Sequence, residues 1–137
     1  MTLRLDLLLV DDDQFVRDVL ARLLERRFSV WCAASAEEAL EIIVEHPHFD
    51  VILSDVMMPG LGAEGLLPRL PAQLQERVIF MTGGLAFDGV RQFLDRAQRP
   101  VLIKPLSAIE MFQTIDDLIG AEAPSVPVHA KTRAAAG

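Results

Sequence analysis

VILSDVMMPG, residues 51–60, is an apolar run that stops on an aspartate and then turns on a proline and a glycine. A short run of β-branched and aliphatic residues bounded by turn residues is typical of a strand buried on both faces of a sheet. Asp55 at the end of this strand either caps the next element or places a charge at a site. The segments before and after the run decide between these two interpretations.

Strand-like and helix-like segments alternate along the rest of the chain. Apolar runs of strand length lie at residues 5–10, 28–34, 51–54, 78–81 and 101–103. Segments with helical spacing of their apolar residues lie between and after them, at 15–24, 35–46, 64–70, 86–97 and 107–120. Five strands that alternate with helices through short links predict an α/β fold, with one parallel sheet covered by helices on both faces.

Local signals predict how the helices begin and which side chains they bury. Asp13 is expected to cap the first helix, and Ser35-Ala-Glu-Glu38 and Ser107-Ala-Ile-Glu110 fit capping boxes. Apolar stripes predict the inward faces of the first and last helices. Their predicted inward side chains are Phe15, Val16, Val19, Leu20, Leu23, Leu24, Ile109, Phe112, Ile115 and Ile119.

The composition excludes several classes of protein. A chain of 137 residues with a net charge of −7 fits one globular domain, and the charge argues against direct binding to nucleic acid. No apolar run is long enough to span a bilayer and no signal peptide is present, so we expect a cytoplasmic location without membrane contact. The single cysteine, Cys32, excludes an internal disulfide and is expected to be a buried apolar side chain.

The domain is expected to occupy residues 1–120. Residues 121–137 are rich in proline and alanine and have no periodicity, which predicts a flexible tail or linker. His129 lies in this tail, and we assign it no chemical role. His46 and His48 flank a proline at a helix end, which indicates a surface turn rather than a pair of metal ligands.

Charged and hydroxyl side chains follow the predicted strands at their carboxyl ends. They are Asp11, Asp12, Asp13, Asp55, Thr82 and Lys104. Because ligands bind beyond the carboxyl ends of parallel strands, we expect these side chains to converge on one edge of the sheet. Neighbouring ionised carboxylates repel one another unless a cation binds between them. Mg²⁺ is such a cation, because it prefers carboxylate oxygens as ligands together with phosphate oxygens. The constellation therefore indicates phosphoryl transfer with Mg²⁺ as cofactor.

Four motifs in this order resemble the receiver domain of two-component response regulators. They are LLLVDDD at 7–13, VILSDVMMPG at 51–60, IFMTGG at 79–84 and LIKP at 102–105. The resemblance covers residues 5–120 and implies a flavodoxin-like, doubly wound sheet with strand order 2-1-3-4-5. It is strongest toward receivers attached to hybrid sensor histidine kinases.

The resemblance also implies a role for each site residue. Asp55 would accept the phosphoryl group, and Thr82 and Lys104 would contact its oxygens. Asp12 would bind Mg²⁺ directly and Asp11 through water, with Asp55 and the backbone carbonyl of Met57 completing the metal site. The Lys104-Pro105 peptide bond would be cis.

The implied partner is a histidine kinase or a histidine phosphotransfer protein, and the implied state is a monomer or weak homodimer. No stand-alone enzyme is expected beyond self-phosphorylation from a phosphohistidine donor and self-dephosphorylation. A place within a larger hybrid histidine kinase stays open.

Two alternatives remain open from the sequence. One is an aspartyl-phosphate phosphatase resembling the haloacid dehalogenase group. In such a protein Asp11 and Asp13 would form the D-x-D motif, and the other catalytic residues would be Thr82, Lys104 and Asp116-Asp117. This alternative leaves Asp55 without a role. The other is a pseudo-receiver that binds partners without phosphorylation, and the complete set of site residues argues against it.

The chain departs from the receiver pattern at two places. After Met58-Pro59-Gly60, receivers commonly continue with an apolar residue and then Asp-Gly, but Leu61-Gly62-Ala63-Glu64 stands here. The third helix is therefore expected to begin differently, and Pro68 and Pro71 weaken it. Val101 stands where the family often has an aromatic residue, which puts an aromatic switch at this position in doubt.

Overall fold

A computed structural model describes residues 4–84 and 88–122 of the chain. Within these residues the strands are β1 (Leu5–Val10), β2 (Phe28–Ala33), β3 (Val51–Asp55), β4 (Val78–Thr82) and β5 (Val101–Ile103). The helices are α1 (Gln14–Leu24), α2 (Ala36–Glu45), α3 (Gly62–Arg69), α4 (Ala72–Gln75), α5 (Asp88–Ala97) and α6 (Ala108–Glu122).

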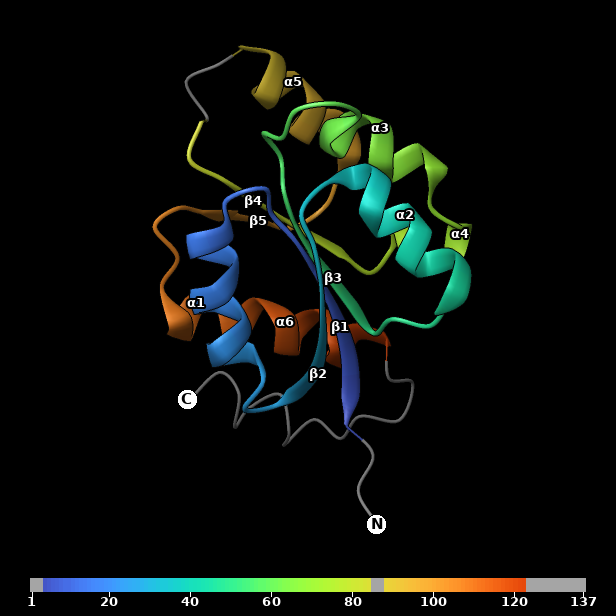
Figure 1. The fold of residues 1–137 in the computed structure, drawn as a ribbon. Helices are drawn as coiled ribbons and strands as arrows, with labels where there is room; N and C mark the ends of the chain where they lie inside the picture. Colours follow the sequence, from blue (N-terminus) through green and yellow to red (C-terminus); the bar gives the residue numbers. More distant parts are fainter. Residues whose placement is uncertain (1–3, 85–87, 123–137) are drawn as a thin grey trace.

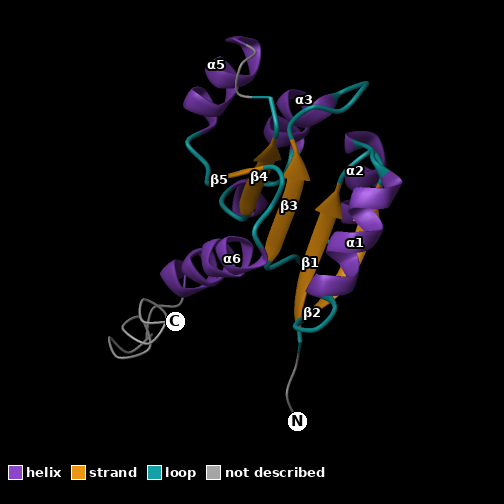
Figure 2. Ribbon diagram, turned by 90° about the vertical axis from the view of Figure 1, so that its left-hand side faces the viewer, coloured by secondary structure: helices purple, strands orange, loops and turns teal. Residues whose placement is uncertain are grey.

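The strands form one parallel sheet in the order β2-β1-β3-β4-β5 (Figures 1 and 2). β1 pairs with both β2 and β3, and its last residue, Val10, lies opposite Ala33 and Ser54. Because neighbouring strands end at similar heights, the residues that follow them meet at one edge of the sheet. The predicted α/β, flavodoxin-like fold and strand order are confirmed.

Helices cover both faces of the sheet and produce two separate cores. α1 and α6 pack on one face, where Leu20, Leu24, Met111 and Ile115 meet the strand residues Leu7, Leu9, Leu53, Ile79 and Met81. α2, α3 and α5 pack on the other face, where Ala39, Ile43, Leu66 and Phe93 meet Leu8, Ile52, Val78 and Phe80. Successive strand residues alternate between the two cores, which explains why the sequence of each central strand is continuously apolar.

The predicted caps of three helices are confirmed. Asp13 accepts a hydrogen bond from the Val16 N–H at the start of α1. Ser35 Oγ accepts one from the Glu38 N–H at 3.0 Å, and Ser107 Oγ accepts one from the Glu110 N–H at 3.3 Å. Side chains close in sequence make these bonds, so local sequence determines them.

Two helix boundaries and one additional short helix differ from the prediction. α3 begins at Gly62 rather than at residue 64 and contains Pro68, which its last turn accommodates. The four-residue α4, which the sequence did not indicate, begins directly after Pro71. α6 continues through Gly120 to Glu122, because a single glycine near a helix end weakens the helix without stopping it. The predicted tail beyond 122 lies outside the described residues.

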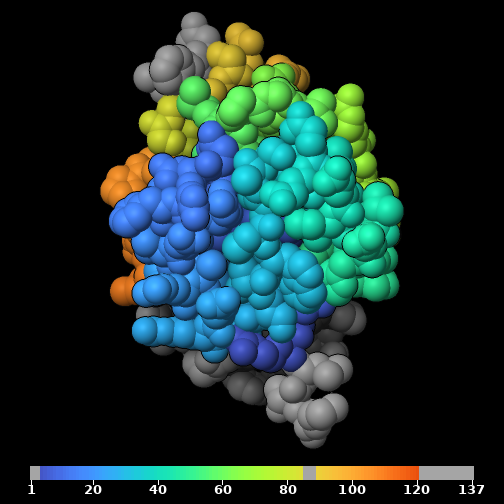
Figure 3. Space-filling model, in the orientation of Figure 1, coloured from blue at the N-terminus to red at the C-terminus, as the bar shows by residue number. Residues whose placement is uncertain are grey.

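The predicted burial is wrong for four apolar residues. Cys32 is exposed, and β2, the strand that carries it, lies at the edge of the sheet. In Figure 3, β2 and α2 lie beside the blue α1 on the face toward the viewer. Phe15, Val19 and Ile109 are also exposed. In α6 the buried side chains are Met111, Ile115 and Leu118, and the predicted Phe112 and Ile119 pack partly buried against the same core.

The predicted surface turn after α2 contacts more of the protein than expected. The His46 ring stacks on Trp31 with centroids 4.3 Å apart, and its Nε2 lies 3.2 Å from Asp6 Oδ2. His48 is exposed. Among the residues that the structure describes, no helix combines the length and the apolar content that crossing a membrane requires.

Candidate acidic site at the carboxyl edge of the sheet

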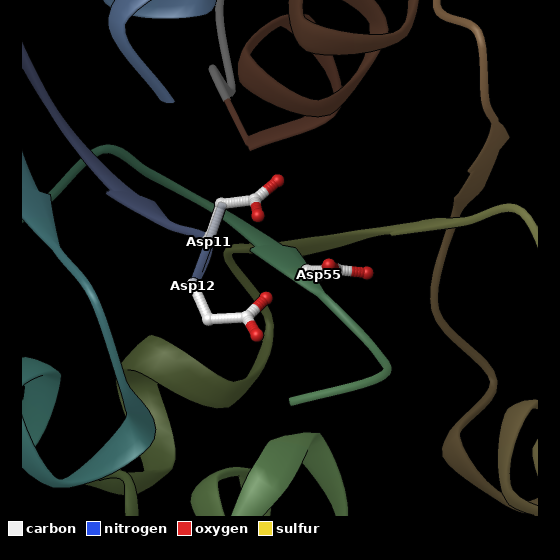
Figure 4. A group of neighbouring side chains, drawn as sticks. All are labelled: Asp11, Asp12 and Asp55. Carbon is white, nitrogen blue, oxygen red and sulfur yellow. The ribbon is translucent and has the colours of Figure 1, made fainter. Parts of the chain in front are cut away.

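Three carboxylates from two neighbouring strands meet at the carboxyl edge of the sheet. Asp11 and Asp12 directly follow β1, and Asp55 is the last residue of β3, its neighbour in the sheet. One oxygen from each carboxylate lies within 4.8 Å of the others (Figure 4). The predicted convergence of these three residues is confirmed.

Lys104, at the end of the edge strand β5, forms ion pairs with two of these carboxylates. It follows β5, and its Nζ lies 3.0 Å from Asp11 Oδ2 and 3.1 Å from Asp55 Oδ2. The Lys104-Pro105 peptide bond is cis, as the resemblance implies. Only about a quarter of the Lys104 side chain is exposed, so the two ion pairs are partly shielded from water.

Asp11 is fully buried, and both of its carboxylate oxygens have partners. Oδ1 accepts a hydrogen bond from the Asp13 N–H at 2.9 Å, while Oδ2 pairs with Lys104. The Asp11 backbone carbonyl accepts a hydrogen bond from Arg17 Nη1 at 2.7 Å, a contact that the sequence did not indicate. Asp12, in contrast, is exposed, and no described residue pairs with its carboxylate.

Asp55 is buried, with only 7% of its surface exposed. Its Oδ1 accepts a hydrogen bond from the Met57 N–H at 3.3 Å, and its Oδ2 pairs with Lys104. Burial raises the pKa of Asp55, and the Asp11 charge raises it further against the lowering effect of Lys104. For Lys104, burial alone lowers the pKa, but the hydrogen bonds and charges of Asp11 and Asp55 outweigh burial and raise it.

Thr82 and Met57 complete the group of predicted site residues. Thr82 ends β4 with its side chain fully buried, and its Oγ1 accepts a hydrogen bond from the Gly84 N–H at 3.0 Å. The hydroxyl keeps its own proton available for donation to a ligand oxygen. Met57 lies two residues past Asp55 on the connection to α3, and nearly half of its surface is exposed. Asp13 caps α1 and is not part of the site.

The residues of the site fit a hard divalent cation. Three carboxylates face one ammonium group, so the site retains negative charge after Lys104 has paired. Carboxylate oxygens are the ligands that Mg²⁺ prefers, and Asp12 offers oxygens that no described residue occupies. The site therefore combines a buried carboxylate, a neighbouring cation and free oxygen ligands.

The response regulator receiver domain family matches residues 7–116. The chain belongs to this family. The curated relatives of this receiver include the sensory/regulatory protein RpfC of Xanthomonas campestris, 28% identical over 82% of the chain, and the transcriptional regulatory protein MalR of Bacillus subtilis, 35% identical over 80%. The chain spans only 16% of RpfC and 48% of MalR.

Solved structures agree with the fold of this receiver. A response regulator receiver domain protein from Clostridium thermocellum has a TM-score of 0.76 and 26% identity, covering 86% of this chain and 96% of that one. The chemotaxis protein CheY4 of Vibrio cholerae has a TM-score of 0.71 at 23% identity, covering 85% of this chain and 99% of its own, and shows the fold alone.

Asp55→Asn is expected to raise the free energy of unfolding at neutral pH without metal, by about 1 kcal/mol. Because the pKa of Asp55 is raised in the folded protein, the folded state binds more protons than the unfolded chain. The wild type therefore loses stability as pH rises from the ordinary value of 3.8 through the raised folded value. Urea unfolding of both proteins across this pH range measures the difference in their free energies of unfolding. The advantage of the asparagine variant should shrink as the pH becomes acidic. An asparagine variant no more stable than the wild type at neutral pH would contradict it.

Proposed function

We propose that this receiver accepts a phosphoryl group on Asp55 from the phosphohistidine of a histidine kinase or a histidine phosphotransfer protein. The observation that carries this proposal is the position of Asp55, a buried carboxylate at a strand end, 3.1 Å from Lys104 Nζ and beside two further carboxylates. A rigid strand end fixes the direction of attack, which is most of what catalysis of phosphoryl transfer requires.

In the proposed step an Asp55 carboxylate oxygen forms a bond to phosphorus, and the phosphorus–nitrogen bond of the phosphohistidine breaks. The bonding electron pair returns to the imidazole nitrogen of the donor. Lys104 pairs with one oxygen of the transferred group, and the Thr82 hydroxyl donates a hydrogen bond to another. Both side chains then stabilise negative charge that the incoming group brings into the site.

Asp11, Asp12, Asp55 and the Met57 backbone carbonyl are the groups that would hold Mg²⁺. Bound there, Mg²⁺ would neutralise charge on the carboxylates and the phosphoryl oxygens. We assign direct contact to Asp12, because its carboxylate is exposed and unpaired among the described residues. Asp11 acts through water, because Lys104 and the Asp13 N–H already engage its two oxygens.

The contacts of two residues disfavour the phosphatase alternative. Asp13, which would be its second acidic residue, caps α1 through the Val16 N–H. Asp116, from its acidic pair, instead pairs with Arg27 on the surface of α6. Membership in the receiver family favours the same conclusion. Attachment to a hybrid histidine kinase, a cytoplasmic location and a monomeric or weakly dimeric state remain part of this proposal.

The test is incubation of the protein with acetyl phosphate and Mg²⁺, followed by intact-mass measurement. We expect the mass of one added phosphoryl group and its loss on treatment with hydroxylamine, which cleaves acyl phosphates. Omission of Mg²⁺ or acetyl phosphate serves as the control. A protein that stays unmodified with acetyl phosphate and with a phosphohistidine donor would instead support the pseudo-receiver alternative.

Asp12→Ala is expected to weaken Mg²⁺ binding by at least about tenfold and to leave the fold intact. Removal of one carboxylate also reduces repulsion with Asp11 and Asp55, so the variant should be at least as stable as the wild type. Melting temperatures measured over a range of Mg²⁺ concentrations test both points, because a ligand that binds the folded state raises the melting temperature. A wild-type melting temperature that does not change with millimolar Mg²⁺ would contradict a metal site here.

A further inference from the structure

We propose that Glu37, in the first turn of α2, is a positioning residue for the acceptor site. Its carboxylate holds the connection between β3 and α3, residues 56–61, and this connection carries Met57 next to Asp55. Glu37 does not touch the acceptor itself. The inference rests on the proposed function, because it assigns Glu37 an effect on Mg²⁺ binding and on phosphoryl uptake.

One hydrogen bond joins Glu37 to the end of the connection. Glu37 Oε2 accepts a hydrogen bond from the Leu61 N–H at 3.2 Å, across 24 residues of sequence. Leu61 is the N-cap residue of α3, and its own side chain makes no capping bond. The carboxylate from α2 therefore accepts from one of the N–H groups that the start of a helix leaves unpaired, at the helix end that favours negative charge.

Gly60, the residue before Leu61, lies close to the same carboxylate. A Cβ atom at Gly60 would lie 2.6 Å from Glu37 Oε2, closer than real Cβ atoms approach other atoms. Gly60 also has a φ of 77°, a conformation that residues with side chains rarely adopt. In Figure 3 green atoms of the region that contains the connection and α3 lie against the cyan start of α2.

The connection is short and is anchored at both ends. At one end the Met57 N–H donates to Asp55 Oδ1 at 3.3 Å, and at the other the Leu61 N–H donates to Glu37. Only Met58, Pro59 and Gly60 separate the two anchors. Loss of the Glu37 bond therefore frees the far end of the segment that places the Met57 backbone beside the acceptor.

The test compares Glu37→Ala and Glu37→Gln with the control Glu41→Ala. Glu41 lies one turn further along α2, is exposed, and has no hydrogen bond or ion pair among the described residues. The glutamine oxygen can still accept the Leu61 N–H. Three quantities are measured for each protein: amide hydrogen exchange at Leu61 without metal, the Mg²⁺ dissociation constant by calorimetry, and the acetyl phosphate reaction rate at limiting and saturating Mg²⁺.

Glu37→Ala should speed exchange at Leu61 and raise the Mg²⁺ dissociation constant by about tenfold, the lower end for residues that orient metal ligands. Its reaction rate should fall at limiting Mg²⁺ and recover at saturating Mg²⁺. Glu37→Gln should restore most of the affinity, and Glu41→Ala should match the wild type.

A purely structural role for Glu37 would lower the melting temperature and leave Mg²⁺ affinity equal to that of Glu41→Ala, which would overturn the inference. A wild type that binds no Mg²⁺ would also overturn it. If the wild type binds Mg²⁺ but takes up no phosphoryl group, the proposed function fails, while the changes in Leu61 exchange and Mg²⁺ affinity still support positioning by Glu37.

Discussion

Asp55→Asn is expected to abolish phosphoryl uptake from acetyl phosphate completely. An asparagine keeps the size of the side chain and can still accept the Met57 N–H, but its amide does not form an acyl phosphate. Because the change is expected to stabilise the fold, loss of uptake cannot be attributed to unfolding. Intact-mass measurement after a fixed incubation with Mg²⁺ gives the result directly.

Asp13→Asn is the matched control for this experiment. It makes the same chemical change two residues from Asp11, and asparagine caps helices about as well as aspartate. Asp13 caps α1 and lies outside the acidic site, so uptake should stay at the wild-type level. If Asp11→Asn abolished uptake while Asp55→Asn retained it, the acceptor would be Asp11 and the phosphatase alternative would be favoured.

Lys104→Met is expected to lower the free energy of unfolding at neutral pH by about 3 kcal/mol. The change keeps an unbranched side chain but leaves the buried Asp11 and Asp55 carboxylates facing each other without their shared cation. Without the ammonium, which lowers the pKa of Asp55, that pKa should rise further in the folded state. The loss of stability should therefore be largest at neutral pH and should shrink as the pH falls and Asp55 becomes protonated.

A double-mutant cycle gives this prediction its control. In the Asp55→Asn background only one buried carboxylate is left without its cation, so Lys104→Met should cost much less there. Lys104→Arg keeps the charge but places a planar guanidinium where a compact ammonium lies, and we expect partial retention of stability. Equal losses for Lys104→Met in both backgrounds, measured by urea unfolding, would show that Lys104 and Asp55 are not coupled.

The site was predictable from the sequence because of how each of its residues relates to a strand. Asp11, Asp12, Asp55, Thr82 and Lys104 all directly follow or end a short apolar run. In a parallel sheet all strands point the same way, so the residues at their carboxyl ends lie at one edge of the sheet. Their convergence can therefore be predicted without knowledge of any long-range contact. The caps at Asp13, Ser35 and Ser107 were predictable for a related reason, since each bonds a backbone N–H three residues away.

The burial of particular side chains was less predictable. Cys32 lies in an apolar run like those of the central strands, yet it is exposed because β2 has a neighbour on one side only. Strand order decides which run lies at an edge, and a run of strand length carries no record of that order. The same holds for α6, where the rotation of the helix against the sheet selects Met111 over Ile109.

The sequence by itself determined the alternation of strands and helices, the caps, and the set of charged residues at the carboxyl edge. Each depends on residues that are close in sequence or on a general property of parallel sheets. Only the tertiary structure decided that Lys104 joins Asp11 and Asp55 and that Glu37 caps α3 at Leu61. Those contacts link residues 24 to 93 positions apart, so they exist only once the strand order and the packing of the helices bring them together.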